Sequence, residues 1–200
     1  MPTASRAKHK FCRRIGQCLW GDPKCPSVKR PYAAGPHGKG RRSKLSTYGE
    51  LLMEKQKLRN YYAISEKQLR IAFAKAKSGE GQTHEKLFRS LEQRLDAMVY
   101  RAGFAPTIFA AKQIVNHGHI LVDGKRIDRS SCLVKEGQVI SIDAEKSPKL
   151  AEIAKKNNTT VPAYMEVDLD NLKATLVRAP QIEEIPVAVK IMSVIEYYAR

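Results

Sequence analysis

The chain has 200 residues, of which 36 are basic and 20 acidic, so its formal net charge at neutral pH is +16. Its 42% hydrophobic content is typical of a folded protein, and its length allows one large domain or two small ones. No apolar run reaches the roughly 18 residues of a membrane-spanning helix, and no apolar signal segment opens the chain. We therefore expect neither a membrane protein nor a secreted one.

Residues 1–45 are the most basic part of the chain. They hold twelve of the 36 basic residues and a single acid, Asp22. Prolines and glycines interrupt the segment from Pro23 to Gly40, so we expect a basic N-terminal arm with little core of its own. Such concentrated positive charge indicates a polyanionic partner, above all a nucleic acid. The arm then depends on a metal ion or on that partner for its order.

The arm also contains three of the four cysteines, close to a histidine. The order His9-x2-Cys12-x5-Cys18-x6-Cys25 offers the four ligands of a tetrahedral zinc site. Neighbouring Arg and Lys residues favour the thiolate form that binds metals. Only one pair has a close chelating spacing, so inert thiols remain the alternative to zinc. A disulfide is less expected, because an intracellular nucleic-acid-binding protein would lie in a reducing compartment.

Residues 46–91 are predicted to form a helical domain. Thr47 and Glu50 have the spacing of a capping box, which predicts the start of a first helix. A second helix extends to a Ser-Gly-Glu-Gly break. A third helix is predicted from Thr83 to Gly103, because leucines recur at helical spacing and glycine is typical of a C-terminal cap. We assign these apolar stripes to the core.

Residues 92–146 are predicted to form a compact helix–helix–hairpin–strand module. Thr107 is the expected N-cap of a short helix over "IFAAKQIVNH". The Asp-Gly pair at 123–124, between "HILV" and "KRI", is typical of a type I′ hairpin. The Glu-Gly pair at 136–137 predicts another turn, followed by a third strand.

Residues 147–200 begin with a predicted linker helix, "KLAEIAKKNN", followed by two alternating segments, "AYMEVDLD" and "KATLVRAP", predicted as strands. The terminal "SVIEYYAR" is compatible with a strand or a short helix. We expect this C-terminal part to pack back on the helical domain. The predicted fold class is therefore α+β, a helical domain with a basic arm and an inserted helix–helix–β-hairpin module.

The sequence offers little support for an enzyme. "GPHGKG" lacks the spacing of a phosphate-binding P-loop, which requires glycine at Ala33 and Ser or Thr at Gly40. His117, His119 and Cys132 could suggest a nucleophile or a metal cluster. We favour structural roles for them, since the first ends a predicted helix, the second opens a predicted strand and a cysteine is a common core residue.

The segments "RLDAMVYRAGF" and "AAKQIVNHGHILVDGKRI" resemble the small RNA-binding module named after small-subunit ribosomal protein S-four. The matching positions include Arg94-Leu95-Asp96, Arg101, Gly103-Phe104, Ala111, Gln113, Val115, His117-Gly118-His119, Val122, Asp123-Gly124 and Arg126. The flanking segments "KRPY", "AGPHGKGRRSKLSTYGELLMEKQKLRNYYAISEKQLR", "AYMEVD", "KATLVRAP" and "VIEYYAR" are similar to the S-four family itself, in its alphaproteobacterial or mitochondrial-like branch. The resemblance thus covers nearly the whole chain.

Two departures from the family pattern affect phosphate contacts. The family's Gly-Gln-His-Gly loop reads Gly-Pro-His-Gly at 35–38, which removes a side-chain amide and a backbone donor. The short helix carries Ile108 and Phe109 where relatives often have arginines. In the arm, "FCRR" and "DPKC" match two of the four cysteine positions that some members carry, whereas many other members have none.

The resemblance implies a structural constituent of the small ribosomal subunit. It implies early binding to a multi-helix junction of the ribosomal RNA, which nucleates assembly of the subunit body. It also implies contacts with ribosomal proteins S-five and S-three and with messenger RNA at its entrance, where the protein supports accuracy. The expected compartment is the bacterial cytoplasm, with a mitochondrial ribosome as the alternative.

The expected RNA contacts are basic and polar residues of the arm, the first helix and the inserted module: Arg13, Arg14, Arg30, His37, Lys39, Arg41, Arg42, Lys44, Lys55, Lys57, Arg59, Lys112, Gln113, Asn116, His117, His119, Lys125 and Arg126. Two other functions remain open. An RNA-modifying enzyme or chaperone would need a catalytic set that the flanks of the module lack. A zinc-dependent DNA-binding regulator would need a recognition helix where the arm has prolines and glycines.

Overall fold

The computed structural model describes residues 9–40, 44–144, 146–157 and 160–199. The chain divides into two compact units. Unit 1 is Met1–Glu66 together with Val187–Arg200, and unit 2 is Lys67–Pro186. None of the described helices combines the length and the hydropathy that crossing a bilayer requires.

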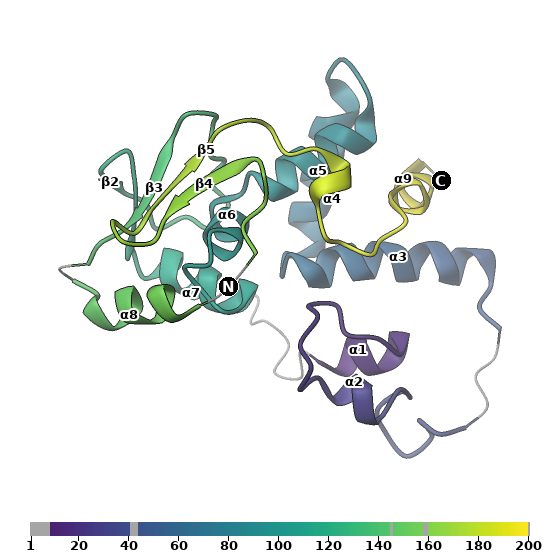
Figure 1. Cartoon of the computed structure of the whole chain (residues 1–200). Coiled ribbons are helices and arrows are strands. Elements are labelled where there is room, and N and C mark those ends of the chain that lie inside the picture. Colours follow the sequence, from purple (N-terminus) through teal and green to yellow (C-terminus); the bar gives the residue numbers. More distant parts are fainter. Residues whose placement is uncertain (1–8, 41–43, 145, 158–159, 200) are drawn as a thin grey trace. The chain divides into compact units, whose positions relative to one another are not determined.

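Unit 1 is helical throughout its regular structure. Its described helices are α1 (His9–Ile15), α2 (Pro26–Lys29), α3 (Thr47–Tyr61) and α9 (Ile191–Ala199) (Figure 1). The terminal segment is therefore a helix, and it packs against α3 although more than a hundred residues separate the two in sequence. Apolar residues of both helices are buried, among them Leu51, Leu58 and Val194.

The cap of α3 lies one residue before the predicted one. Ser46 has an extended backbone, and its side chain accepts a hydrogen bond from the Gly49 N–H at 3.2 Å. Thr47 is already the first helical residue. The prediction is corrected by one position, because either hydroxyl residue suits a cap and the backbone conformation decides between them.

Unit 2 contains the remaining described helices and a sheet. These helices are α4 (Glu66–Ser78), α5 (Thr83–Glu92), α6 (Leu95–Arg101), α7 (Ile108–Asn116), α8 (Pro148–Lys156) and the 3-10 helix η1 (Ile182–Glu184). The first residue of α4, Glu66, still belongs to unit 1.

The predicted long helix from Thr83 to Gly103 is wrong, since the chain breaks between α5 and α6. Arg94 has an extended backbone and forms an isolated antiparallel bridge with Leu133. Its guanidinium binds the Asp96 carboxylate at 3.0 and 2.8 Å. This tertiary pairing replaces the helical hydrogen bonds that the leucine spacing favours.

The sheet of unit 2 has five antiparallel strands in the order β2-β1-β3-β5-β4. The strands are β1 (Ile120–Val122), β2 (Lys125–Arg126), β3 (Val139–Ile142), β4 (Met165–Asp168) and β5 (Lys173–Leu176). Asp123 and Gly124 both have positive φ, 48° and 77°, as the type I′ hairpin requires. The predicted turn before β3 is also present, with Gly137 at φ 81°.

The C-terminal strands belong to the five-stranded sheet of unit 2. Strand β5 pairs with β3, with Val139 opposite Thr175, and β4 pairs with β5. Helix α9 belongs to unit 1, where it packs on α3. The pairing covers the edge of β3, whose backbone groups would otherwise lack ladder partners.

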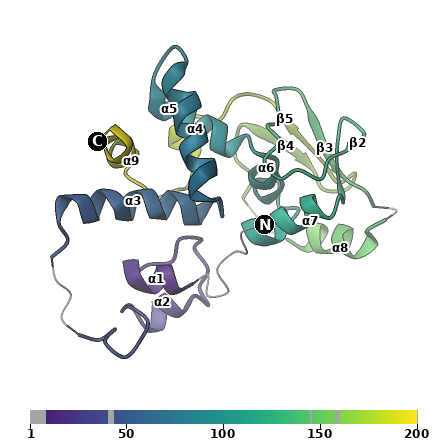
Figure 2. The same cartoon turned by 180° about the vertical axis from the view of Figure 1, so that it is seen from behind.

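A hydrophobic core of described residues joins the sheet of unit 2 to three of its helices. It joins α6 and α7 to the inner face of the sheet and to α8 (Figure 2). Phe104, Ile120, Ile140, Ala154 and Tyr164 are all fully buried in it. This core fixes the short helix α7 and the β1–β2 hairpin, and so positions the candidate RNA-binding side chains on them.

Candidate metal centre and nucleic-acid interface

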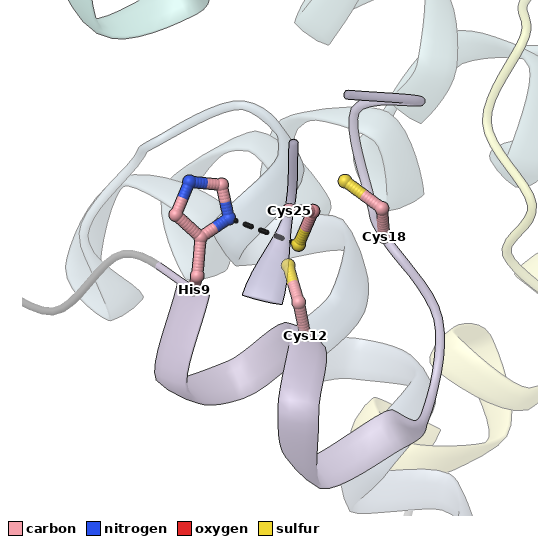
Figure 3. A group of neighbouring side chains, drawn as sticks. All are labelled: His9, Cys12, Cys18 and Cys25. Atoms are coloured by element: carbon pink, nitrogen blue, oxygen red, sulfur yellow. Dashed lines mark hydrogen bonds between the residues drawn. The ribbon is translucent and has the colours of Figure 1, made fainter. Parts of the chain in front are cut away.

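His9, Cys12, Cys18 and Cys25 form one cluster within unit 1 (Figure 3). Helix α1 carries the first two residues three positions apart, which places them on one face. The chain turns at Gly16, which has a φ of 82° and donates its N–H to the Cys12 carbonyl at 2.9 Å. The returning segment then brings Cys18 and Cys25 to the same place.

The ligand atoms of the cluster are close enough to share one ion. A ring nitrogen of His9 and the three Sγ atoms all lie within 4.8 Å of one another. The Cys25 Sγ lies 3.1 Å from His9 Nδ1. Cys12 and Cys25 are buried, His9 and Cys18 are half-buried, and all four cysteines of the chain are free thiols. The four residues named from spacing alone therefore converge on one point.

The surroundings of the cluster act in opposite directions on the pKa values of Cys12 and Cys25. Burial, reinforced by charge on the neighbouring sulfurs, raises the pKa of Cys12 to about 12. Burial also acts to raise the pKa of Cys25, but hydrogen bonds from Ser27, Cys18 and Cys12 together lower it below its ordinary value. The buried Ser27 hydroxyl lies 3.1 Å from the Cys25 sulfur. Three thiolates within 4.8 Å of one another repel, so a bound cation is needed to keep all three ionised.

The residues of the cluster fit zinc. Three thiols and one imidazole are the donor set of a closed structural zinc site. With Zn–S bonds of about 2.3 Å, the sulfurs of a tetrahedral site lie about 3.8 Å apart. That separation lies within the 4.8 Å that bounds the distances between the ligand atoms of the cluster. Arg and Lys side chains of the same arm would balance the remaining thiolate charge.

Trp20, the single tryptophan of the chain, connects the cluster to α3. Its ring meets the His9 ring edge-on, with centroids 5.9 Å apart and an angle of 86° between the planes. Its Nε1 donates a hydrogen bond to the Tyr61 carbonyl at 3.2 Å. The sequence analysis missed this residue, and its position between two ligand cysteines was the one available signal.

The expected RNA contacts of the arm are largely accessible. Arg13 is half-buried and donates hydrogen bonds to backbone carbonyls. Arg41 and Arg42 lie outside the described residues. The other expected residues of the arm are exposed: Arg14, Arg30, His37, Lys39 and Lys44.

The expected contacts on α3 are not accessible in the same way. Lys55 is only 4% exposed, and its ammonium lies 2.7 Å from a Glu66 carboxylate oxygen. The Lys57 ammonium lies 2.6 Å from Glu54, with 16% of the lysine side chain exposed. Arg59 is half-buried. The expectation that Lys55 contacts RNA is corrected, because a buried and paired ammonium cannot reach a phosphate.

The inserted module presents several of its expected residues on the surface. Arg126 lies against Gly118, where an added Cβ would meet the guanidinium at 2.2 Å, and it donates to the His117 carbonyl at 3.3 Å. His119 is half-buried, with Nδ1 2.6 Å from the Ser147 hydroxyl. The exposed residues of the expected set are Gln113, His117, Lys125 and Arg126, and the half-buried ones are Lys112, Asn116 and His119.

Lys112 has an unusual environment for a candidate phosphate contact. Burial, with a smaller contribution from the nearby Arg94, lowers the pKa of its ammonium below the ordinary value, whereas Asp96 acts in the opposite direction. A nearby phosphate would act in the same direction as Asp96 and favour the protonated form of this ammonium. The position therefore suits an anion.

Two arginines of the RNA-module motif are structural. Arg94 is buried and bound to Asp96, and Arg101 is buried and bound to Glu92, to which the Tyr164 hydroxyl also donates at 2.9 Å. Burial and the neighbouring Glu92 raise the pKa of Tyr164. The motif thus combines surface residues for a ligand with buried ion pairs for the fold.

The basic surface and the helix–helix–hairpin unit define a class of protein, namely an RNA-binding protein that carries an S-four-type module. Comparison with known proteins agrees. Residues 4–92 match the family described as "Ribosomal protein S4/S9 N-terminal domain", and residues 93–140 match the "S4 domain".

Full-length relatives identify the family. The chain is 46% identical over 206 residues to the "Small ribosomal subunit protein uS4" of Ruegeria pomeroyi, with 100% of both chains covered. It is 47% identical to that of Cereibacter sphaeroides and 46% identical to that of Paracoccus denitrificans, each with 100% of both chains covered. The chain belongs to the family of small-subunit ribosomal proteins uS4.

Proposed function

We propose that this chain is a structural constituent of the small ribosomal subunit that binds the small-subunit ribosomal RNA directly. The observation that carries the proposal is the full-length identity to bacterial small-subunit proteins, at 46–47% with both chains completely covered. Its family is one of ribosomal proteins, not of enzymes. Early binding to a multi-helix junction, which nucleates assembly of the subunit body, is the finer role that we propose.

Binding depends on phosphate contacts and shape rather than on base sequence. The deep, narrow major groove of A-form RNA hides the base edges, so proteins read phosphates, 2′-hydroxyls and distorted junctions. The exposed basic residues of the arm and of the β1–β2 hairpin supply cations at fixed positions. The proposed contacts exclude Lys55 and are Arg14, Arg30, His37, Lys39, Arg41, Arg42, Lys44, Lys57, Arg59, Lys112, Gln113, Asn116, His117, His119, Lys125 and Arg126, with Arg13 discussed below.

A zinc ion at the His9, Cys12, Cys18 and Cys25 cluster would stabilise the arm. In the described part of the arm, regular structure is limited to the seven residues of α1 and the four of α2. Helices this short do not persist on their own in water. A structural zinc supplies folding free energy directly when its ligands come from separate segments, as they do here. We infer that zinc is the resident metal.

The zinc proposal is tested by native mass spectrometry of the purified chain. We expect one zinc per chain, lost when Cys12 and Cys25 are both replaced by serine. Replacing Cys132, which lies outside the cluster, with serine is the matched control and should leave the zinc bound. A metal-free chain with an ordered arm would refute the proposal and leave RNA as the source of that order.

The wider partners follow from the family. We propose contacts with ribosomal proteins S-five and S-three, and with messenger RNA at its entrance, where the protein contributes to translational accuracy. The bacterial relatives support the bacterial cytoplasm as the compartment. A mitochondrial ribosome is the alternative, because the chain is basic and holds no acidic residue before Asp22.

Co-sedimentation tests the function most directly. A tagged full chain should migrate with small ribosomal subunits on a sucrose gradient, and should bind in-vitro-transcribed small-subunit ribosomal RNA in the absence of other proteins. A chain that stays at the top of the gradient would favour an RNA-modifying enzyme or chaperone. Preferential binding to duplex DNA would favour the DNA-regulator alternative.

A further inference from the structure

Arg13 directly follows the cluster residue Cys12 on α1, but its side chain is directed to another part of the arm. Its Nε donates to the Tyr32 carbonyl at 3.1 Å, and its Nη2 donates to the Ala33 carbonyl at 3.2 Å. Its Cζ also lies 5.0 Å from the centroid of the Tyr32 ring. The planar guanidinium therefore holds two consecutive peptide groups and one aromatic ring against α1.

The segment held by Arg13 is part of the basic loop, defined here as residues 29–40. Gly38 packs so tightly on the same segment that an added Cβ would lie 1.9 Å from the Ala33 carbonyl oxygen. The Gly38 N–H also donates to the Gly35 carbonyl at 3.1 Å, which closes the turn. A shift of the Ala33 peptide would therefore displace this turn.

Two proposed RNA contacts depend on that turn. The Lys39 ammonium lies 5.6 Å from the centroid of the Tyr32 ring, the ring that also contacts Arg13. The carbonyl of His37 accepts a hydrogen bond from the Gly40 N–H at 3.1 Å. Both side chains are exposed and both sit on backbone that Arg13 stabilises. A series of contacts thus connects the cluster of His9, Cys12, Cys18 and Cys25 to the cations of the basic loop.

The beginning of this series of contacts is α1, which has seven residues and no acidic residue in its first turn. A helix of that length is unstable alone, and repulsion among its basic side chains weakens it further. His9 and Cys12 lie on it, so an ion bound by them and by two cysteines of the returning segment would hold it in place. Arg13 would then have a fixed base from which to hold the loop.

We propose that Arg13 is a positioning residue that couples metal binding at the His9, Cys12, Cys18 and Cys25 cluster to the RNA affinity of the basic loop. The proposal rests on the function proposed above. Metal binding raises the affinity for ribosomal RNA by ordering the loop in advance, which lowers the entropy that RNA binding has to remove. Because the coupling is reciprocal, RNA binding raises the affinity for the metal by the same factor.

Arg14 provides a matched control for Arg13. It is the next residue on α1, carries the same charge and is exposed. Loss of either side chain removes one positive charge from the same helix. Only the loss of Arg13 removes the hydrogen bonds to the loop, so the two variants separate positioning from direct charge.

The experiment measures the dissociation constant for in-vitro-transcribed small-subunit ribosomal RNA with zinc-loaded and zinc-stripped full chain. For the wild type we expect zinc loading to tighten binding about tenfold, within the usual range of coupling factors. Arg14→Gln should weaken binding in both forms and keep the tenfold ratio, with a salt slope smaller by about one unit. Arg13→Gln should bind one zinc, by native mass spectrometry, and reduce the ratio to about one.

A second measurement needs no variant. Competition with a chelator gives the zinc affinity of the wild type with and without the RNA, and RNA should raise it by the factor found above. A wild type that binds zinc and RNA independently overturns the coupling and leaves the proposed function intact. A tenfold ratio retained by Arg13→Gln overturns the role of Arg13. A chain that binds no zinc overturns the zinc proposal and the coupling with it, whereas a chain that binds no ribosomal RNA contradicts the proposed function itself.

Discussion

The ammonium of Lys55 lies 2.7 Å from a carboxylate oxygen of Glu66 and 4.4 Å from the centroid of the Tyr197 ring. The Tyr198 hydroxyl donates to the same Glu66 oxygen at 3.1 Å. These contacts join α3, the start of α4 and α9, all within unit 1. The sequence suggested that Lys55 contacts RNA, but in the structure it holds the C-terminal helix in place. Its packing beside Glu66 and Tyr197 decides between these two roles.

Replacing Glu66 with Gln should destabilise unit 1 in a pH-dependent way. Burial acts to raise the pKa of Glu66, but the hydrogen bond and charge of Lys55, with Tyr198 and Arg59, lower it below the ordinary 4.5. A carboxyl group whose pKa is lowered in the folded state stabilises the fold at pH values above its ordinary pKa. This stabilisation is lost as the pH falls through the lowered pKa. We expect a loss of about 1 kcal/mol at neutral pH, modest because Glu66 is partly exposed.

Thermal unfolding of the full chain by circular dichroism measures this effect. The difference between the wild type and Glu66→Gln should be present at neutral pH and should disappear well below pH 4.5, where both chains lack the charge. Glu183→Gln, which changes an exposed carboxylate of unit 2, is the control and should have little effect at either pH. An equal loss at both pH values would contradict the ion-pair explanation.

At the scale of elements, the junction of α5 and α6 depends on buried charges rather than on helix propensity. Glu92, the last residue of α5, is fully buried and bound by Arg101 at the end of α6 and by Tyr164 just before β4. One carboxylate thus connects two helices and the start of the C-terminal hairpin. Its burial is tolerated because a cation and a hydroxyl both donate to it.

Replacing Glu92 with Met should lower the free energy of unfolding by about 3 kcal/mol, because it removes the carboxylate from the buried Arg101 guanidinium. The double variant Glu92→Met with Arg101→Met should recover much of that loss, since it removes both charges and adds apolar contacts. Urea unfolding of the full chain measures both changes. If the double variant is no more stable than Glu92→Met alone, the ion pair itself contributes net stability.

At the scale of the whole molecule, charge is the property that most directly predicts the partner. The formal charge of +16 is concentrated toward the N-terminal arm, where Arg14, Arg30 and Lys39 are exposed. Unit 2 adds the exposed Lys125 and Arg126 of its hairpin. A polyanion that contacts both regions would displace counterions along its length, so binding should depend on the number of phosphates neutralised.

The affinity for small-subunit ribosomal RNA should therefore fall steeply with salt. We expect a plot of log affinity against log salt concentration with a slope several units negative, measured by filter binding of the full chain. Reversing Arg41 and Arg42 to Glu should weaken binding strongly and flatten the slope, while circular dichroism of the free chain stays unchanged. A flat salt response in the wild type would rule out phosphate-driven binding.

The sequence by itself determined those features that depend on neighbouring residues. The Asp123-Gly124 hairpin follows from the ability of these residues to adopt positive φ. The close spacing of His9 and Cys12 indicated a chelating pair, although the helix α1 that carries them was not predicted. Net charge indicated the nucleic-acid partner because charge adds up without regard to fold. The family motifs extended these local signals to the whole chain.

Only the tertiary structure decided which distant groups meet. Spacing named Cys18 and Cys25 as ligands, but the turn at Gly16 and the packing of the arm bring them to His9. Pairing of β5 with β3, burial of Lys55 and the break at Arg94 likewise depend on partners remote in sequence. Local patterns leave these choices open, because a strand edge, an ammonium or a guanidinium has many suitable partners and the packed core selects one.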